Sequence, residues 1–251
     1  TKMTLTSAGR LGVGLTDPSD LFEVSNSADT PTRAIVTAED SAGTNQNAFI
    51  KTKAKGNYYE GLEMASTSGH IGMWGGYYSG SAVLQARVGG SGINSSDVKA
   101  IEIDANGHVA MPSQPAFLAY PNGDQSNMAN DATMVLDQEI YDQNADYNTS
   151  NYTFTAPVTG KYLLTLNLRV QSLDTDSAYF QAIILTSNKE YQSIISTNRF
   201  SGDPLYWYVG VTVVADMDAS DTAIPRVFIE GSNTHQVDMA TDSYFSGCLL
   251  A

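Results

Sequence analysis

The sequence predicts an all-β chain in two parts, and three observations support this prediction. Apolar and polar residues alternate at 164–170, so one face of that segment is aliphatic and the other polar, as in a strand. Turn dipeptides such as Asn106-Gly107 recur at short intervals, while helical periodicity is hard to find. Of the 21 glycines, 15 precede Pro112, so the two parts differ in composition.

The boundary between the two parts is predicted at 112–115. Two prolines lie three residues apart there, which excludes a continuous helix or a central strand. Charge is also divided unevenly. Residues 1–112 carry 8 basic and 11 acidic side chains, whereas residues 113–251 carry 5 and 16, which together give the net charge of −14.

Charge and apolar patterning exclude several functional classes. A net charge of −14 repels phosphate backbones and anionic headgroups, so we expect no nucleic-acid partner. The longest apolar segments, 182–185 and 211–215, have the length of strands, so we expect no membrane insertion. Cys248 is the single cysteine and is expected to be a small buried hydrophobe. Because the chain opens at Thr1, we expect a piece of a longer protein.

The first part contains little apolar side-chain area for its length. Its apolar strips, 11–15, 21–24 and 83–88, are short and lie among Ser, Thr, Asn and Gly. Glycine adds no buried side-chain area, and ordering it costs more backbone entropy than any other residue. At about 25 cal/mol per Å² of apolar surface, such strips would hardly stabilise a monomer. Several copies wound about a common axis would supply the missing neighbours, which predicts a fibre.

A known shaft motif matches this part. Residues 6–18 read Thr-Ser-Ala-Gly-Arg-Leu-Gly-Val-Gly-Leu-Thr-Asp-Pro, and Leu-Phe-Glu-Val follows at 21–24. The run resembles the Gly-Arg-Leu-Gly-Ile-Gly-Thr unit of trimeric bacteriophage tail-fibre shafts, and 100–112 is similar to a degenerate second copy. The resemblance implies that 1–112 is a glycine-rich shaft of three intertwined chains.

The second part carries three ordered motifs. They are Gln-Pro-Ala-Phe-Leu-Ala at 114–119, Tyr-Thr-Phe-Thr-Ala-Pro-Val at 152–158 with Gly160 and Tyr162 after it, and Phe-Ser-Gly-Cys-Leu-Leu at 245–250. They resemble the globular head of the complement C1q and tumour-necrosis-factor superfamily. The resemblance implies that 113–251 is a trimeric jelly-roll β-sandwich, a head carried by the shaft.

No constellation in the sequence predicts an enzyme. The three histidines lie in no metal-binding spacing, and the nucleophile and phosphate-loop motifs are missing. Glu60 and Glu63 suit a glycosidase pair in type, but residues three apart on a strand face opposite sides of the sheet.

Ion binding stays open beside the simpler interpretation of solvated acidic loops. Some members of the resembled family bind Ca²⁺ at the trimer apex, and Ca²⁺ takes six to eight oxygen ligands that three chains could pool. In a trimeric shaft, a histidine near the axis becomes three and could hold an axial metal ion. The candidate ligands are Asp174, Asp176, Asp216, Asp218, Asp221, His70 and His108.

The jelly-roll topology implied by the resemblance predicts which loops share an end. Loops 172–177, 198–204 and 231–242 should lie at the tip, while 156–160, 187–190 and 216–224 should face the shaft. Polar groups with an exposed aromatic suit glycan recognition, although these loops could also merely cap the barrel. The tip candidates are Asp174, Asp176, Asn198, Arg199, Phe200, Asp203, Asn233, His235 and Asp238.

The aromatic run at 206–208 and the aromatics Trp74, Tyr77 and Tyr78 are expected in the core or in a subunit interface.

Taken together, the shaft motif, the head resemblance and the tip loops predict a homotrimeric phage tail-fibre tip. It would attach the virion to a bacterial surface receptor, and a glycan is the expected receptor. It would join upstream fibre or tail proteins, be made in the bacterial cytoplasm and act outside the cell. The alternatives are a secreted C1q-like binding module and a tailspike that depolymerises polysaccharide.

Overall fold

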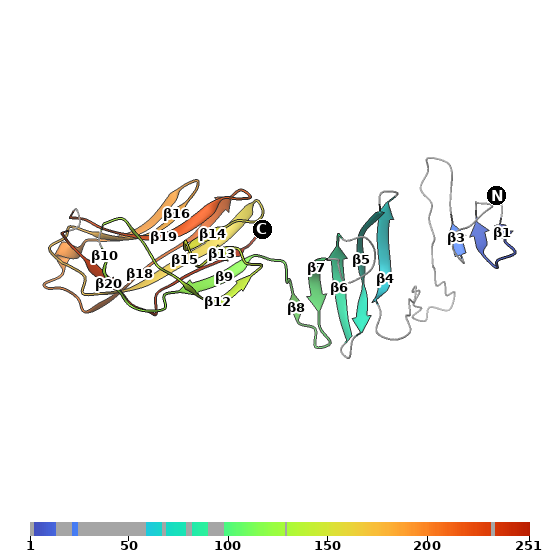
Figure 1. Cartoon of the computed structure of the whole chain (residues 1–251), viewed down its shortest axis with the longest axis horizontal. Helices are drawn as coiled ribbons and strands as arrows, with labels where there is room; N and C mark the ends of the chain where they lie inside the picture. Colours follow the sequence, from blue (N-terminus) through green and yellow to red (C-terminus); the bar gives the residue numbers. More distant parts are fainter. Residues whose placement is uncertain are drawn as a thin grey trace, which may run out of the picture. The chain divides into compact units, whose positions relative to one another are not determined.

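The computed structural model confirms an all-β chain in the residues that it describes (Figure 1). One helical turn, Thr197–Arg199, interrupts the strands. No helix of the described part has the length or apolarity to cross a membrane. The described residues fall in two units, one within 1–54 and one within 55–251. They are 3–13, 22–24, 59–66, 69–78, 82–89, 98–128, 130–231 and 234–251.

The first unit contains a small sheet built from the predicted shaft motif. Strands β1 (Met3–Leu5) and β2 (Leu11–Val13) form an antiparallel hairpin, and β3 (Phe22–Val24) pairs with β2 in parallel. The hairpin turn needs Gly9, whose φ of +77° is rarely adopted by other residues. The Gly-Arg-Leu-Gly motif therefore encodes a turn followed by a strand.

The second unit begins with a five-stranded antiparallel meander. Its order is β4-β5-β6-β7-β8, the order of the sequence. Gly107, with φ +86°, forms the predicted hairpin turn between β7 and β8. The strands are β4 (Tyr59–Ser66), β5 (Gly69–Tyr78), β6 (Ala82–Val88), β7 (Val98–Ile103) and β8 (Val109–Ala110).

Along β6 of this meander, polar and apolar side chains lie on opposite faces of the sheet. Gln85 and Arg87 are buried, and the Gln85 amide donates to Glu102 and accepts from Arg87. On the opposite side Leu84 and Val88 are exposed. Along β6, polar side chains are therefore buried and apolar side chains are exposed.

Residues 111–115 form no strand and separate the meander from two packed sheets. The first sheet has the order β10-β20-β15-β21-β9-β12, with β18 on the other edge of β15. Its strands are β9 (Ala116–Tyr120), β10 (Gln125–Met128), β12 (Gln138–Gln143), β15 (Gly160–Gln171), β18 (Tyr206–Met217), β20 (Val237–Met239) and β21 (Tyr244–Leu249).

The second sheet has the order β13-β14-β19-β16-β17, with β11 paired to β19. Sequence-distant strands are neighbours in both sheets, which is the connectivity of a jelly roll. The strands are β11 (Ala132–Thr133), β13 (Tyr147–Asn148), β14 (Thr153–Thr155), β16 (Phe180–Thr186), β17 (Glu190–Ile195) and β19 (Thr222–Ile229).

An aromatic cluster fills the space between the two sheets at one end of the sandwich. Phe117 stacks on Tyr147 and Phe154, with ring centroids 5.1 and 4.8 Å away, and meets Phe245 edge-on at 5.1 Å. Gly247 allows this packing, because a Cβ there would lie 2.8 Å from the Phe117 ring. The motifs that carry the resemblance are thus core positions.

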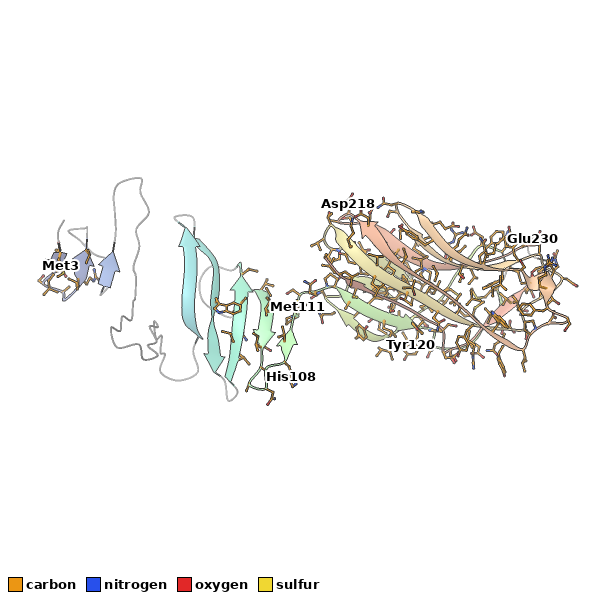
Figure 2. All side chains as sticks on the ribbon, turned by 180° about the vertical axis from the view of Figure 1, so that it is seen from behind. Met3, His108, Met111, Tyr120, Asp218 and Glu230 are labelled. Carbon is orange, nitrogen blue, oxygen red and sulfur yellow. The ribbon has the colours of Figure 1, made fainter. Side chains whose placement is uncertain are left out.

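Strand registers fix the two ends of the sandwich. At the entry end, Lys161 N–H donates to Ala251 O and Leu249 N–H to Pro115 O, so both termini of the domain meet there. The opposite, far end follows from β15, whose Gln171 pairs with Tyr206. Figure 2 shows Asp218 and Glu230 at the two ends. Loops 172–177, 198–204 and 231–242 gather at the far end, as the topology predicts.

Cys248 is less buried than predicted. Phe245 and Gly247 of β21 are buried, whereas Cys248 is half-buried on the outer face of the sheet. Strand periodicity is the reason, since Cys248 is one residue out of step with the buried positions.

Candidate functional site

The far-end loops are joined to one another by side-chain contacts. Asp203 Oδ1 accepts hydrogen bonds from the Thr175 amide, at 2.9 Å, and from its hydroxyl, at 2.5 Å. His235 Nδ1 lies 3.0 Å from Asp174 Oδ2, and both side chains are half-buried. The structure therefore brings three of the predicted tip residues into one network that spans all three loops.

The other tip candidates have different surroundings. Asp176, Asn198 and Arg199 are exposed at the loop surface. Phe200 packs edge-on against Trp207, with ring centroids 4.9 Å apart, and is half-buried. Asn233 lies outside the described residues.

The Asp238 side chain binds a backbone amide and so holds two strands together instead of presenting itself at the tip surface. Its Oδ1 accepts the Asn127 N–H at 2.7 Å, and Asn127 has a φ of +56°. This bond fixes the irregular pairing of β10 with β20. Asp238 is therefore explained by the fold alone.

One contact between the loops has no signal in the sequence. The hydroxyls of Ser177 and Thr197 are buried and lie 2.7 Å apart, and Thr197 Oγ1 also donates to Ser177 O at 2.5 Å. Small polar residues in loops are common, so only the folded structure reveals that this pair ties the loops together.

The Asp203 contacts predict a pH-dependent loop. The hydrogen bonds from the Thr175 side chain and backbone lower the pKa of the Asp203 carboxyl below its ordinary value. A lowered pKa stabilises the folded loop above the ordinary value, and the stabilisation is lost as pH falls through the lowered value. We expect amide hydrogen exchange at Thr175 to accelerate in Asp203→Asn at neutral pH. Equal exchange in both proteins would contradict the assignment.

A second cluster lies where β15 and β18 pair near the far end. The Arg169 guanidinium lies 5.3 Å from the Tyr206 ring centroid and 2.7 Å from Asp242. Asp242 also accepts the Tyr208 hydroxyl at 2.8 Å, and this bond raises the pKa of Tyr208. Tyr206 and Tyr208 are each 56% exposed, so they are not core residues. Trp207 lies between these two tyrosines in β18, so its side chain points to the opposite face of the sheet, where it contacts Phe200.

The candidate metal ligands are engaged in other contacts. Asp216 pairs with Lys161 at 2.5 Å, and Asp221 Oδ2 accepts from Asn188 and from the Asp218 amide. No three His, Cys, Asp or Glu side chains of the described part gather as a metal site would require.

The two shaft histidines, His70 and His108, belong to the meander, and an axial ion would require three copies of it. His108 is exposed, and its Nδ1 lies 2.9 Å from Asp104 in the β7–β8 turn. His70 belongs to β5, but its side chain lies outside the described part.

The comparison that decides the family is a match of the C1q domain model to residues 116–250. The chain belongs to the C1q domain family. The matched residues include the two packed sheets and the described parts of all three far-end loops. Comparison with curated protein sequences gives no match.

Several solved structures are similar to part of this chain. The globular domain of zebrafish complement 1qA is 15% identical, covers 55% of this chain and 98% of its own, and has a TM-score of 0.44. Murine APRIL at pH 8.0 is 10% identical, with coverages of 55% and 99% and a TM-score of 0.41. The Eiger TNF of S. frugiperda is 14% identical, with coverages of 55% and 94% and a TM-score of 0.40.

Proposed function

We propose that this chain is the C-terminal part of a homotrimeric phage tail fibre whose C1q domain attaches the virion to a bacterial surface glycan. The observation that carries the proposal is two groups of exposed apolar side chains, one on a sheet face of the meander and one on a sheet face of the C1q domain, that a single chain leaves uncovered.

The first uncovered face belongs to the C1q domain. Along β15 the buried Tyr162 and Leu164 alternate with Leu163, which points outward and pairs with the exposed Val214. Tyr141, 48% exposed, lines a hollow of about 80 Å³ together with Leu163. We call this outer face of β12-β9-β21-β15-β18 the open face. Farther along the strands this face is polar, since the hydroxyls of Thr165 and Thr212 lie 3.2 Å apart across β15 and β18. Exposed apolar side chains that gather at one end of such a face favour an interaction site there.

The second uncovered face belongs to the meander β4–β8. Trp74 is 43% exposed and lies opposite Ala86, on the side where Leu84 and Val88 are also exposed. Two like copies placed against this side would bury it, which supports a shared interior for residues 1–112. The shaft motif at 6–18 supports the same arrangement.

The far-end loops are the proposed contact surface for the receptor. Their exposed Asn198 and Arg199 and the half-buried Phe200 offer hydrogen-bond donors and acceptors beside an aromatic ring, a mixture that suits glycans. Three heads per fibre and several fibres per virion would convert weak single-site affinity into avidity. The protein would be made in the bacterial cytoplasm, which suits its single cysteine, and would act outside the cell.

Two alternative functions are distinguished by cheap measurements. A secreted C1q-like binding module would share the head but has no reason to carry the shaft motif. A polysaccharide-depolymerising tailspike would release reducing ends from host polysaccharide. We propose a non-enzymatic protein, so no reducing ends are expected on incubation.

The proposal is tested by competition for adsorption. The purified chain, added to host bacteria before the phage that encodes it, is expected to reduce adsorption. Arg199→Ala and Phe200→Ala should each abolish this block, whereas Glu190→Ala at the entry end serves as the matched control. The same assay with a chelator tests the calcium hypothesis.

Unchanged phage adsorption at saturating protein would overturn the proposal. Loss of the block on substituting meander residues, with Arg199→Ala still active, would move the receptor site away from the far end.

A further inference from the structure

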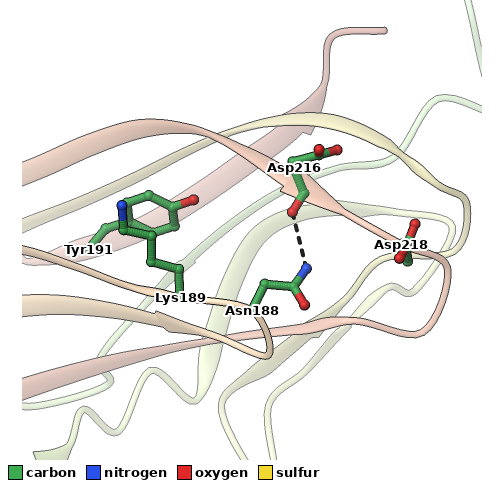
Figure 3. A pocket seen from close by; sticks show the side chains of 5 residues that line it. All are labelled: Asn188, Lys189, Tyr191, Asp216 and Asp218. Atoms are coloured by element: carbon green, nitrogen blue, oxygen red, sulfur yellow. Dashed lines mark hydrogen bonds between the residues drawn. The ribbon is translucent and has the colours of Figure 1, made fainter.

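A pocket at the entry end of the C1q domain, opposite the far-end loops, is not used by any role described above. It has a volume of about 370 Å³, within the range of small-molecule sites. It lies between the β16–β17 turn and the last residues of β18 (Figure 3). The lining residues are Asn188, Lys189, Tyr191, Asp216 and Asp218.

One wall of this pocket is aromatic. Tyr191 belongs to β17 and is half-buried, so its ring is held by the sheet edge while one part stays accessible. The Lys189 ammonium lies over the ring, 5.5 Å from its centroid, and covers part of one face, which leaves the remaining accessible part of the ring for a ligand. An aromatic ring in a polar setting offers an apolar surface on which the C–H face of a sugar ring can pack.

The other wall supplies fixed hydrogen-bonding groups. Asn188 Nδ2 donates to Asp216 O at 3.3 Å and to Asp221 Oδ2 at 2.6 Å, so the amide is locked in one orientation. Asp218 is held by its backbone N–H, which donates to Asp221 at 2.8 Å. These contacts preorganise the Asn188 amide and the backbone at Asp218 without any ligand, which lowers the entropic cost of binding one.

The charges around the pocket favour a neutral ligand. Lys161 neutralises Asp216 at 2.5 Å, which leaves Lys189 and Asp218 as opposite charges across the opening. A cation would compete with the Lys189 ammonium for the Tyr191 ring, and an anion would meet the carboxylates of Asp218 and the neighbouring Asp221. A neutral polyhydroxylated molecule meets neither obstacle.

We propose that this pocket binds one neutral pyranose unit, packed on Tyr191 and hydrogen-bonded by Asn188, Lys189 and Asp218. It would be a second carbohydrate site, separate from the far-end loops and contained in each C1q domain. It stands on the pocket itself and does not require the receptor to bind at the far end.

The test is saturation-transfer NMR of the full chain with the methyl glycosides of glucose, galactose, mannose and N-acetylglucosamine. At least one glycoside should bind with a Kd on the order of 1 mM, as for a single weak subsite. Tyr191→Ala should weaken that binding about tenfold, the value of one aromatic contact. Tyr191→Phe should retain it, because the ring remains. Glu190→Ala, an exposed neighbour outside the pocket lining, is the control.

Two outcomes would overturn the inference. They are no transfer from any of the four glycosides to the folded protein, and equal affinity in the wild type and Tyr191→Ala. Both are distinguishable from a failure of the attachment proposal. The attachment proposal predicts that the block of phage adsorption depends on Arg199 and Phe200. Because the pocket is a separate site, Tyr191→Ala should still block adsorption.

Discussion

Phe117→Ala is expected to lower the free energy of unfolding of the C1q domain by about 3–5 kcal/mol, the usual cost of truncating a buried aromatic. Phe117 is fully buried and contacts the rings of Tyr147, Phe154 and Phe245. Its removal leaves a cavity that β-strands on both sides cannot close, because each is fixed by its ladder of hydrogen bonds. The loss should appear as a lower denaturant midpoint.

The matched control for this change is Phe117→Leu, which keeps most of the apolar volume and should cost clearly less. Unfolding is followed through Trp207, at one fixed protein concentration because assembly contributes to stability. An alanine variant as stable as the wild type would mean that the aromatic cluster is not the centre of the core.

Tyr141→Glu is expected to dissociate the assembled heads. Tyr141 lies on the open face, 48% exposed in one chain, so a glutamate there remains solvated in the monomer. In the proposed homotrimer the same face would be buried, and each copy would carry an unpaired carboxylate into the interface at a cost of several kcal/mol. At micromolar concentration the molar mass should therefore fall toward that of one chain.

Ile194→Glu is the matched control, because Ile194 is 59% exposed on β17 of the other sheet. It adds the same charge at a position outside the open face that is somewhat more exposed than Tyr141, so assembly should persist. Circular dichroism confirms that both variants keep their strands. Equal dissociation of the two variants would show that charge alone, rather than the open face, controls assembly.

Much of the fold could be predicted from local sequence chemistry. The alternation at 164–170 predicts the strand that becomes the middle of β15, and Asn106-Gly107 predicts the β7–β8 turn. These signals succeed because strand period and turn chemistry depend on neighbours in the chain.

The candidate site was less predictable, because its contacts join residues far apart in sequence. His235 meets Asp174 across 61 positions, and Asp238 caps Asn127 across 111. The acidic spacing at 216–221 left calcium ligands and solvated loop carboxylates open as alternatives, and it gave no sign that Asp216 and Asp218 line a pocket with Tyr191. Residue type alone could not separate these roles, since carboxylates serve turns, ion pairs and ligands equally well.

The central claim is that three identical chains share an apolar interior, and the molar mass in solution tests it most directly. Light scattering coupled to size-exclusion chromatography at micromolar concentration should give about 81 kDa, three times the 26.9 kDa of one chain. A single species of 26.9 kDa would contradict the account, because both uncovered apolar faces would then stand in water.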